Sequence, residues 1–258
     1  MGEDFFLVDI PVFEPLYDAE EKYGWSRYKD NLWNVLKDTT GGYCMYCYDK
    51  VWINEQRRGQ IEHGIERANS KETLSDCVPN LGLACENCNG KFKRRGENKR
   101  KLPISSIKEF IKGDCKKFDC KSPCEKFETL RAEYIKNGKI LIQPFEIKIE
   151  EGHSLRLQFD LLNNKYIPST KCGNYNQEEL DIINGHIKLF GLNGPERPNR
   201  EVSKYCKNVI DNGSILEGIP YNNLVVDLFR RKLKQLDVKE AVKVCNIIYS
   251  RAWMQSST

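Results

Sequence analysis

The chain has 258 residues, a formal net charge of +4 and eleven cysteines. It contains no apolar run of about 18 residues or more, so we expect no transmembrane helix and no membrane partner. The N-terminal sequence MGEDFFLVDIPVFEP has no basic segment and is interrupted by acids and prolines, which argues against a signal peptide. An odd number of cysteines, some at metal-binding spacing, favours a reducing, cytoplasmic compartment over a disulfide framework.

The first predicted element in chain order is a helix. Residues 15 to 38 place most of their aromatic and aliphatic side chains roughly on one face. The sequence Thr39-Thr40-Gly41-Gly42 then breaks the helix. We therefore treat residues 1–40 as an N-terminal helical segment.

Two Cys-x-x-Cys pairs come next, Cys44 with Cys47 and Cys85 with Cys88. Four thiolates at this spacing can close a tetrahedral site for Zn²⁺ and hold the two ends of a small hairpin together. Free thiols buried in a core are the alternative. The spacing favours a structural zinc, with the chemistry beside it.

The chain between the two pairs predicts a strand, a loop, a strand and a helix. The strands are expected at 59–65 and 81–84, the polar loop at 66–76 and the helix from 86 to about 95. Glu62 and His63 are neighbours on the first strand, so their side chains point to opposite sides of it. The economical division places Glu62 towards a divalent cation and His63 towards an attacking water. Taken singly, Glu62 is an ordinary exposed acid and His63 is an ordinary surface or core histidine.

A basic run begins three residues after Cys88. Residues 91 to 101, KFKRRGENKRK, contain seven basic side chains and one acid. A solvated helix end is one interpretation. The position of the run beside a metal site favours contact with a phosphate backbone, so we predict that Lys91, Lys93, Arg94 and Arg95 bind nucleic acid.

Beyond residue 101 the pattern changes to a mostly helical region. Helices are predicted at 105–111, 125–136, 177–189, 200–209 and 222–249, and strands at 140–149 and 155–161. A third cysteine group, Cys115, Cys120 and Cys124, either binds a second zinc or consists of free cysteines. A fourth ligand for that zinc would have to be the distant Cys77, His153 or Cys172.

The sequences CMYC, IEH and PNLGLACENCNGK together resemble the HNH nuclease motif, which has the ββα-metal fold. The resemblance implies that His63 is the general base, that Glu62 and Asn89 hold a catalytic Mg²⁺ or Mn²⁺, and that Asn80 orders the loop around the base. Lys91 corresponds to a lysine that the family keeps near the phosphate. Cys44, Cys47, Cys85 and Cys88 match the zinc-stapled members of the family. Glu62 is longer than the aspartate of many members, and Asn89 is a weaker ligand than the usual histidine.

The predicted fold is therefore α+β, with a zinc-stabilised ββα-metal nuclease core at 41–100 between the N-terminal segment and a docking and positioning region at 101–258. The predicted function is metal-dependent endonuclease, with DNA favoured as substrate and RNA possible. The alternative is a non-catalytic zinc module that binds nucleic acid or a partner protein. The sequences ILIQPF, LRLQFD and GLNGPERPNR also resemble HNH proteins of retron-associated and Septu-type anti-phage systems. That likeness implies an ATPase partner of the ABC or SMC-like type.

Overall fold

The computed structural model describes residues 2–95, 100–112, 117–149, 152–194, 200–215 and 221–255. Within these residues the fold combines helices with three small antiparallel sheets, so the predicted α+β class is confirmed. One sheet has the strand order β1 (Leu7–Asp9), β6 (Leu157–Asp160) and β7 (Lys165–Pro168). The other two are the ribbons β2 (Trp52–Ile53) with β3 (Gln56–Arg57), and β4 (Gly59–His63) with β5 (Leu81–Cys85).

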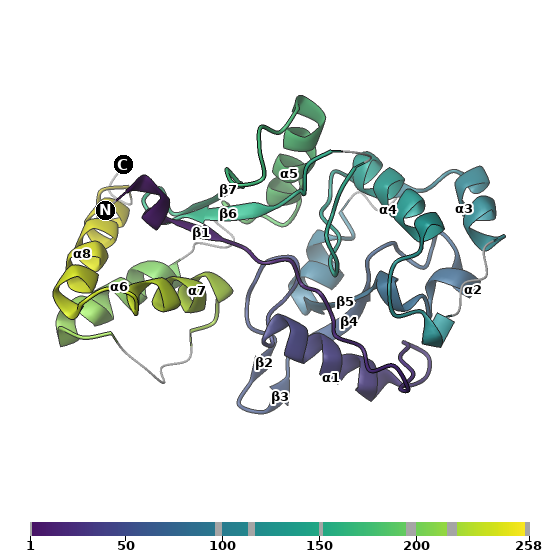
Figure 1. The fold of residues 1–258 in the computed structure, drawn as a ribbon, viewed down its shortest axis with the longest axis horizontal. Coiled ribbons are helices and arrows are strands. Elements are labelled where there is room, and N and C mark those ends of the chain that lie inside the picture. Colours follow the sequence, from purple (N-terminus) through teal and green to yellow (C-terminus); the bar gives the residue numbers. More distant parts are fainter. Residues whose placement is uncertain are drawn as a thin grey trace.

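The helices surround these sheets (Figure 1). Helices α6, α7 and α8 lie at the end of the molecule where both chain termini are found, and the β4–β5 ribbon lies among the elements at the other end. The α-helices are α1 (Lys29–Thr40), α2 (Lys71–Leu74), α3 (Ile104–Ile111), α4 (Glu125–Gly138), α5 (Gln177–Leu189), α6 (Arg200–Asn212), α7 (Leu224–Leu233) and α8 (Val238–Gln255).

The N-terminal helix is shorter than predicted. Helix α1 begins at Lys29, and residues 15–28 run without helix across the molecule. Gly24 packs so tightly that a β-carbon on it would lie 2.3 Å from the ring of Phe118. The backbone N–H of Tyr23 donates to the carbonyl of Phe118. The first aromatic side chains of the predicted helical face therefore belong to a segment without helix, in which the rings of Tyr17 and Tyr23 pack on each other at 4.7 Å between centroids.

The β4–β5 ribbon follows the prediction closely. Its register pairs Glu62 with Gly82 and His63 with Leu81. The predicted helix after it is a π-helical segment, η3 (Asn87–Phe92), which contains Cys88 of the second cysteine pair. The N–H of Cys88 donates to Cys85 Sγ at 3.4 Å, and the N–H of Lys93 reaches back to the carbonyl of Cys88.

The predicted strand at 140–149 is wrong: this segment pairs with no strand in the described structure. Its carbonyl groups are bound instead by Arg131 of α4, which is 1% exposed. The guanidinium donates to the carbonyls of Ile142 at 2.6 Å, Pro144 at 2.9 Å and Phe145 at 3.0 Å. One buried arginine thus binds four carbonyl oxygens of this segment, since the guanidinium also donates to the carbonyl of Glu146.

The helices α3, α4, α5 and α6 lie within a few residues of their predicted positions, and Leu155–Leu161 contains β6. The predicted helix at 222–249 divides into α7 and α8, because Lys234 ends the first helix and Asp237 accepts from the N–H of Glu240 at the start of the second. The apolar stripe of α7 is buried at Leu224, Val225 and Phe229, as expected for a core face.

The buried apolar side chains form one cluster that includes members of all three predicted segments. The ring of Tyr46 stacks on Phe190 of the C-terminal region at 4.7 Å between centroids. Among the described residues, no helix combines the length and the apolar composition needed to cross a bilayer.

Candidate active site

The four cysteines of the two Cys-x-x-Cys pairs meet in space. Their Sγ atoms all lie within 4.8 Å of one another, and the Cys47 and Cys85 sulfurs are 3.7 Å apart. A tetrahedral zinc site with Zn–S bonds of about 2.3 Å requires sulfurs about 3.8 Å apart. Burial raises the pKa of the Cys47 and Cys88 thiols, so holding them as thiolates calls for a bound cation. The cluster is therefore compatible with a structural metal such as zinc.

The first cysteine pair is fixed against the ribbon by backbone hydrogen bonds. The N–H of Cys44 donates to the carbonyl of Asp49 at 2.8 Å, and the N–H of Met45 donates to Leu83 of β5 at 2.9 Å. The second pair begins at Cys85, the last residue of β5, and ends in η3. A metal here would hold the turn after α1, the end of β5 and the start of η3 together.

Tyr46 connects this cluster to the predicted catalytic strand. It lies between Cys44 and Cys47, and its hydroxyl donates to Glu62 Oε2 at 2.7 Å. The Glu62 side chain points inward and is almost fully buried. Burial raises the pKa of Glu62, and the ammonium group of Lys93 opposes that shift.

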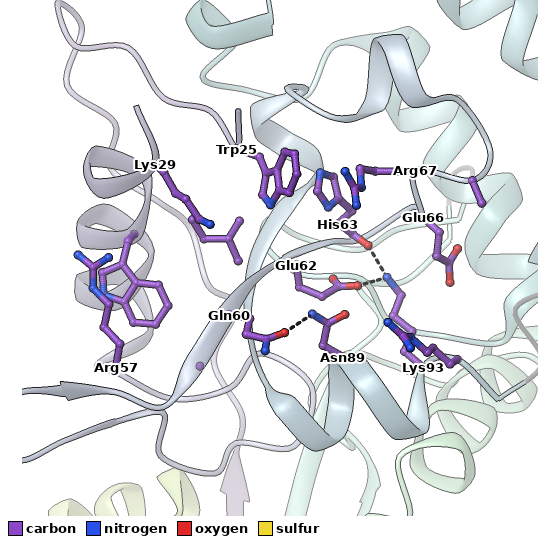
Figure 2. A pocket seen from close by; sticks show the side chains of 15 residues that line it. Trp25, Lys29, Arg57, Gln60, Glu62, His63, Glu66, Arg67, Asn89 and Lys93 are labelled. Carbon is purple, nitrogen blue, oxygen red and sulfur yellow. Dashed lines mark hydrogen bonds and ion pairs between the residues drawn. The ribbon is translucent and has the colours of Figure 1, made fainter. Parts of the chain in front are cut away.

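Lys93 lies in the interior, unlike the surface position that the basic run suggested. The residue is 2% exposed, and its Nζ donates to Glu62 Oε1 and to the backbone carbonyl of His63. Figure 2 shows these two interactions side by side on β4. Lys93, one of the four residues predicted to bind nucleic acid, thus forms an ion pair with a buried carboxylate.

His63 follows Glu62 on β4 and faces the other side of the strand, towards Trp25 and Arg67 (Figure 2). Its Nε2 lies 3.1 Å from the carbonyl oxygen of Ser75. A carbonyl can only accept, so Nε2 carries the proton and Nδ1 keeps its lone pair in the neutral ring. Burial lowers the pKa of His63 to about 4, which keeps the ring neutral near pH 7. The neutral ring therefore has its available lone pair at Nδ1.

Asn80 joins the two ends of the loop between β4 and β5. Its Oδ1 accepts from the N–H of Ile65 at 2.7 Å, and its Nδ2 donates to the carbonyls of Ile65 at 3.0 Å and Leu74 at 3.3 Å. The side chain is fully buried. Because Ser75 follows Leu74, these bonds also position the carbonyl that selects the tautomer of His63.

Asn89 approaches the site from η3. Its Nδ2 donates to Gln60 Oε1 at 2.9 Å, so the carboxamide oxygen is the atom that could bind a cation. In Figure 2 this oxygen and the Glu62 carboxylate lie on the same side of β4, next to Lys93. Carboxylate and carboxamide oxygens are ligands that Mg²⁺ and Mn²⁺ accept, with water completing the shell. In the structure the ammonium of Lys93 contacts Glu62 Oε1, so a divalent cation could bind that oxygen only after the ammonium leaves it.

Glu62, His63, Asn89 and Lys93 line a cleft of about 760 Å³. Its walls carry cationic groups over aromatic rings: the Arg67 guanidinium lies 4.3 Å from the ring centre of Trp25, and that of Arg57 lies 4.9 Å from the ring centre of Trp33. Lys29 and Arg94 also line the cleft.

Sequence reasoning missed the wall residues Trp25, Lys29, Trp33, Arg57 and Arg67. The sequence feature that could have indicated these wall residues is the presence of Arg57 and Arg67 just outside the two ends of the predicted strand.

The remaining predicted nucleic-acid contacts lie outside this cleft. Lys91 and Arg95 are exposed, and both lie over the ring of Phe92, at 5.4 Å and 5.0 Å from its centre. In the third cysteine group, Cys115 is outside the described residues, Cys120 is half-buried and Cys124 is exposed. Among the described residues, the first cluster is the one group of three or more His, Cys, Asp or Glu ligands close enough to share an ion.

Comparison of the chain with protein-family models, curated proteins and solved structures finds no match. The likeness to HNH nucleases therefore depends on the residues named above.

Proposed function

We propose that this protein is a metal-dependent endonuclease of the HNH type, with His63 as its general base. The proposal depends on the different hydrogen-bonding roles of the two ring nitrogens of His63. One ring nitrogen is committed as a donor to the Ser75 carbonyl, and the other is an acceptor in a ring that burial keeps neutral. A base of this kind, on the wall of a cleft lined by basic and aromatic side chains, suits the hydrolysis of nucleic acid.

In the proposed reaction His63 Nδ1 removes a proton from a water molecule in the cleft. The water oxygen forms a bond to phosphorus as the bond from phosphorus to the 3′ oxygen breaks. The products are a 5′ phosphate and, after the leaving oxygen takes up a proton, a 3′ hydroxyl. The Nε2–H bond to Ser75 holds the ring in position and stabilises the imidazolium while it exists.

Glu62 and Asn89 are the residues that would hold the divalent ion. When bound, such an ion supplies positive charge for the phosphate oxygens and the departing 3′ oxygen. Tyr46 keeps one Glu62 oxygen fixed by a hydrogen bond, which presets the direction of the other. A zinc ion at the four cysteines would have a structural role. It would fix the position of Tyr46, which lies between Cys44 and Cys47.

The cleft walls supply the proposed substrate contacts. Arg67, Arg57, Lys29 and Arg94 offer positive charge to a phosphate backbone, and Trp25 offers an aromatic ring for contact with a base. Contacts of this kind do not read base edges, so they support little sequence preference. DNA is the first substrate to test, and RNA is the second.

The experiment is incubation of purified full-length protein with supercoiled plasmid and with labelled RNA, in Mg²⁺, Mn²⁺ or EDTA. We expect nicking that requires the divalent ion and leaves 5′ phosphate ends. The alternative, a non-catalytic zinc module, predicts retention of the nucleic acid in a gel-shift assay without cleavage under any of these conditions. That outcome would refute the proposed activity.

We further propose that the nuclease works within an anti-phage complex beside an ATPase. The support is the sequence likeness described above and the need to restrain a nuclease that has little sequence preference. The C-terminal region would supply the docking surface.

A further inference from the structure

Lys93 is the one buried lysine among the residues whose side chains the structure describes. Its ammonium group is held between two acceptors from β4, Glu62 Oε1 and the His63 carbonyl. The same side chain lines the cleft, and its Nζ is 5.9 Å from the ring centre of Tyr46. A positive charge is therefore already placed at the carboxylate that the proposed divalent ion needs.

Two cations cannot share this position. A divalent ion on Glu62 would bind the oxygen that the ammonium now contacts, and like charges at such a separation repel strongly in a site with little water. A negatively charged Glu62 carboxylate without any cation beside it is also unfavourable. Its side chain is 4% exposed, and without Lys93 the Tyr46 hydroxyl would be its remaining described hydrogen-bond donor. Removal of one cation is thus favourable only if another replaces it.

We infer that Lys93 is a resident cation that competes with the divalent ion for Glu62, and that a nucleic-acid phosphate in the cleft releases it. The lysine side chain has a flexible four-carbon stem, so the ammonium can turn from Glu62 towards an anion in the cleft without moving η3. The inference depends on the proposed function, since it assumes a divalent site at Glu62. Its consequence is reciprocal coupling: nucleic acid tightens metal binding, and metal tightens nucleic-acid binding.

The test measures the dissociation constant of Mn²⁺ by electron paramagnetic resonance of the free ion. It uses zinc-loaded full-length protein in a His63→Ala background, which prevents cleavage. Each variant is measured with and without a short phosphorothioate DNA duplex, and Mn²⁺ bound by the DNA alone is subtracted. Lys93→Met removes the charge at similar length. Lys239→Met removes an exposed charge on α8, at the other end of the molecule from β4, and is the matched control.

We expect the duplex to tighten Mn²⁺ binding by about tenfold when Lys93 is present, which is within the usual range for coupled sites. Lys93→Met should bind Mn²⁺ about tenfold more tightly without DNA, and the duplex should then add little. Lys239→Met should behave as its parent. Equal Mn²⁺ affinity in Lys93→Met and its parent would overturn the inference and leave the proposed metal site intact.

Failure of the proposed function gives a different pattern. If no variant binds Mn²⁺ with or without DNA, while zinc content and melting temperature remain normal, the divalent site at Glu62 is wrong, and the inference is wrong with it. If Lys93→Met does not fold, the Mn²⁺ affinity of the parent protein with and without the duplex still tests the coupling. An Mn²⁺ affinity that the duplex leaves unchanged would overturn the coupling.

Discussion

Asn80→Ala should destabilise the protein through the loop that positions His63. The substitution removes the acceptor of the Ile65 N–H and the donor to the carbonyls of Ile65 and Leu74. All three residues are fully buried, so water cannot easily replace the lost bonds. A buried group left without a partner costs about 1–3 kcal/mol, and the long bond to Leu74 contributes least. We expect a loss of about 3 kcal/mol in the free energy of unfolding.

For a chain of this size that loss corresponds to a melting temperature lower by about 6–12 °C. The assay is urea denaturation followed by tryptophan fluorescence, with zinc present throughout. Asn34→Ala is the matched control, because Asn34 is exposed on α1 and its replacement should change stability by less than about 0.5 kcal/mol. Cleavage by Asn80→Ala should also fall at temperatures where the protein stays folded, since the Ser75 carbonyl would no longer be fixed. A stability within about 0.5 kcal/mol of wild type would refute this role of Asn80.

Three further predictions concern the metal, the buried histidine and the partner. Purified protein should contain at least one zinc per chain. The variants Cys44→Ala and Cys88→Ala should lose that zinc together with hydrogen-exchange protection across residues 43–95. Elemental analysis that finds no zinc in well-folded protein would contradict this. Burial lowers the pKa of His186 to about 3 from an ordinary value of 6.5, so the unfolded chain gains a proton first as pH falls. Stability should therefore decrease from about pH 6.5 downwards by up to about 1.4 kcal/mol per pH unit, and His186→Gln should flatten this decrease in denaturation curves. Co-expression with the adjacent gene product should yield a complex in size-exclusion chromatography, and a chain that stays monomeric beside every genomic neighbour yet cuts efficiently alone would count against a docking role.

The parts of the fold predicted correctly are those with a strong local signal. The Cys-x-x-Cys spacing predicted a cluster whose four sulfurs do meet, and the pattern around Ile61 and Leu83 predicted the paired strands. Helix α5 was predicted with its observed ends, and its first turn has a capping box between Asn176 and Glu179. Each of these patterns spans only a few residues, so it can be recognised in the sequence without knowledge of the tertiary packing.

The errors come from tertiary interactions that the local pattern does not contain. The apolar residues at 140–149 suggested a strand, but the carbonyl groups there are bound by Arg131 from α4. Lys93 belongs to a basic run that is typical of surfaces, and only the folded ribbon brings Glu62 to it. Tyr46 looks like a spacer between two cysteines until the fold places its hydroxyl on Glu62.

The central claim is that His63 is the general base in a hydrolysis of nucleic acid that requires a divalent metal ion. The decisive comparison is the initial rate of plasmid nicking by wild type, His63→Ala and His153→Ala in Mn²⁺, at equal zinc content. His153 is the matched control, because its side chain is 44% exposed and it lies outside the cleft lining. We expect His63→Ala to lose at least about a hundredfold in rate at a temperature where it stays folded, while His153→Ala cuts like wild type. An undiminished rate in His63→Ala would show that His63 is not the base.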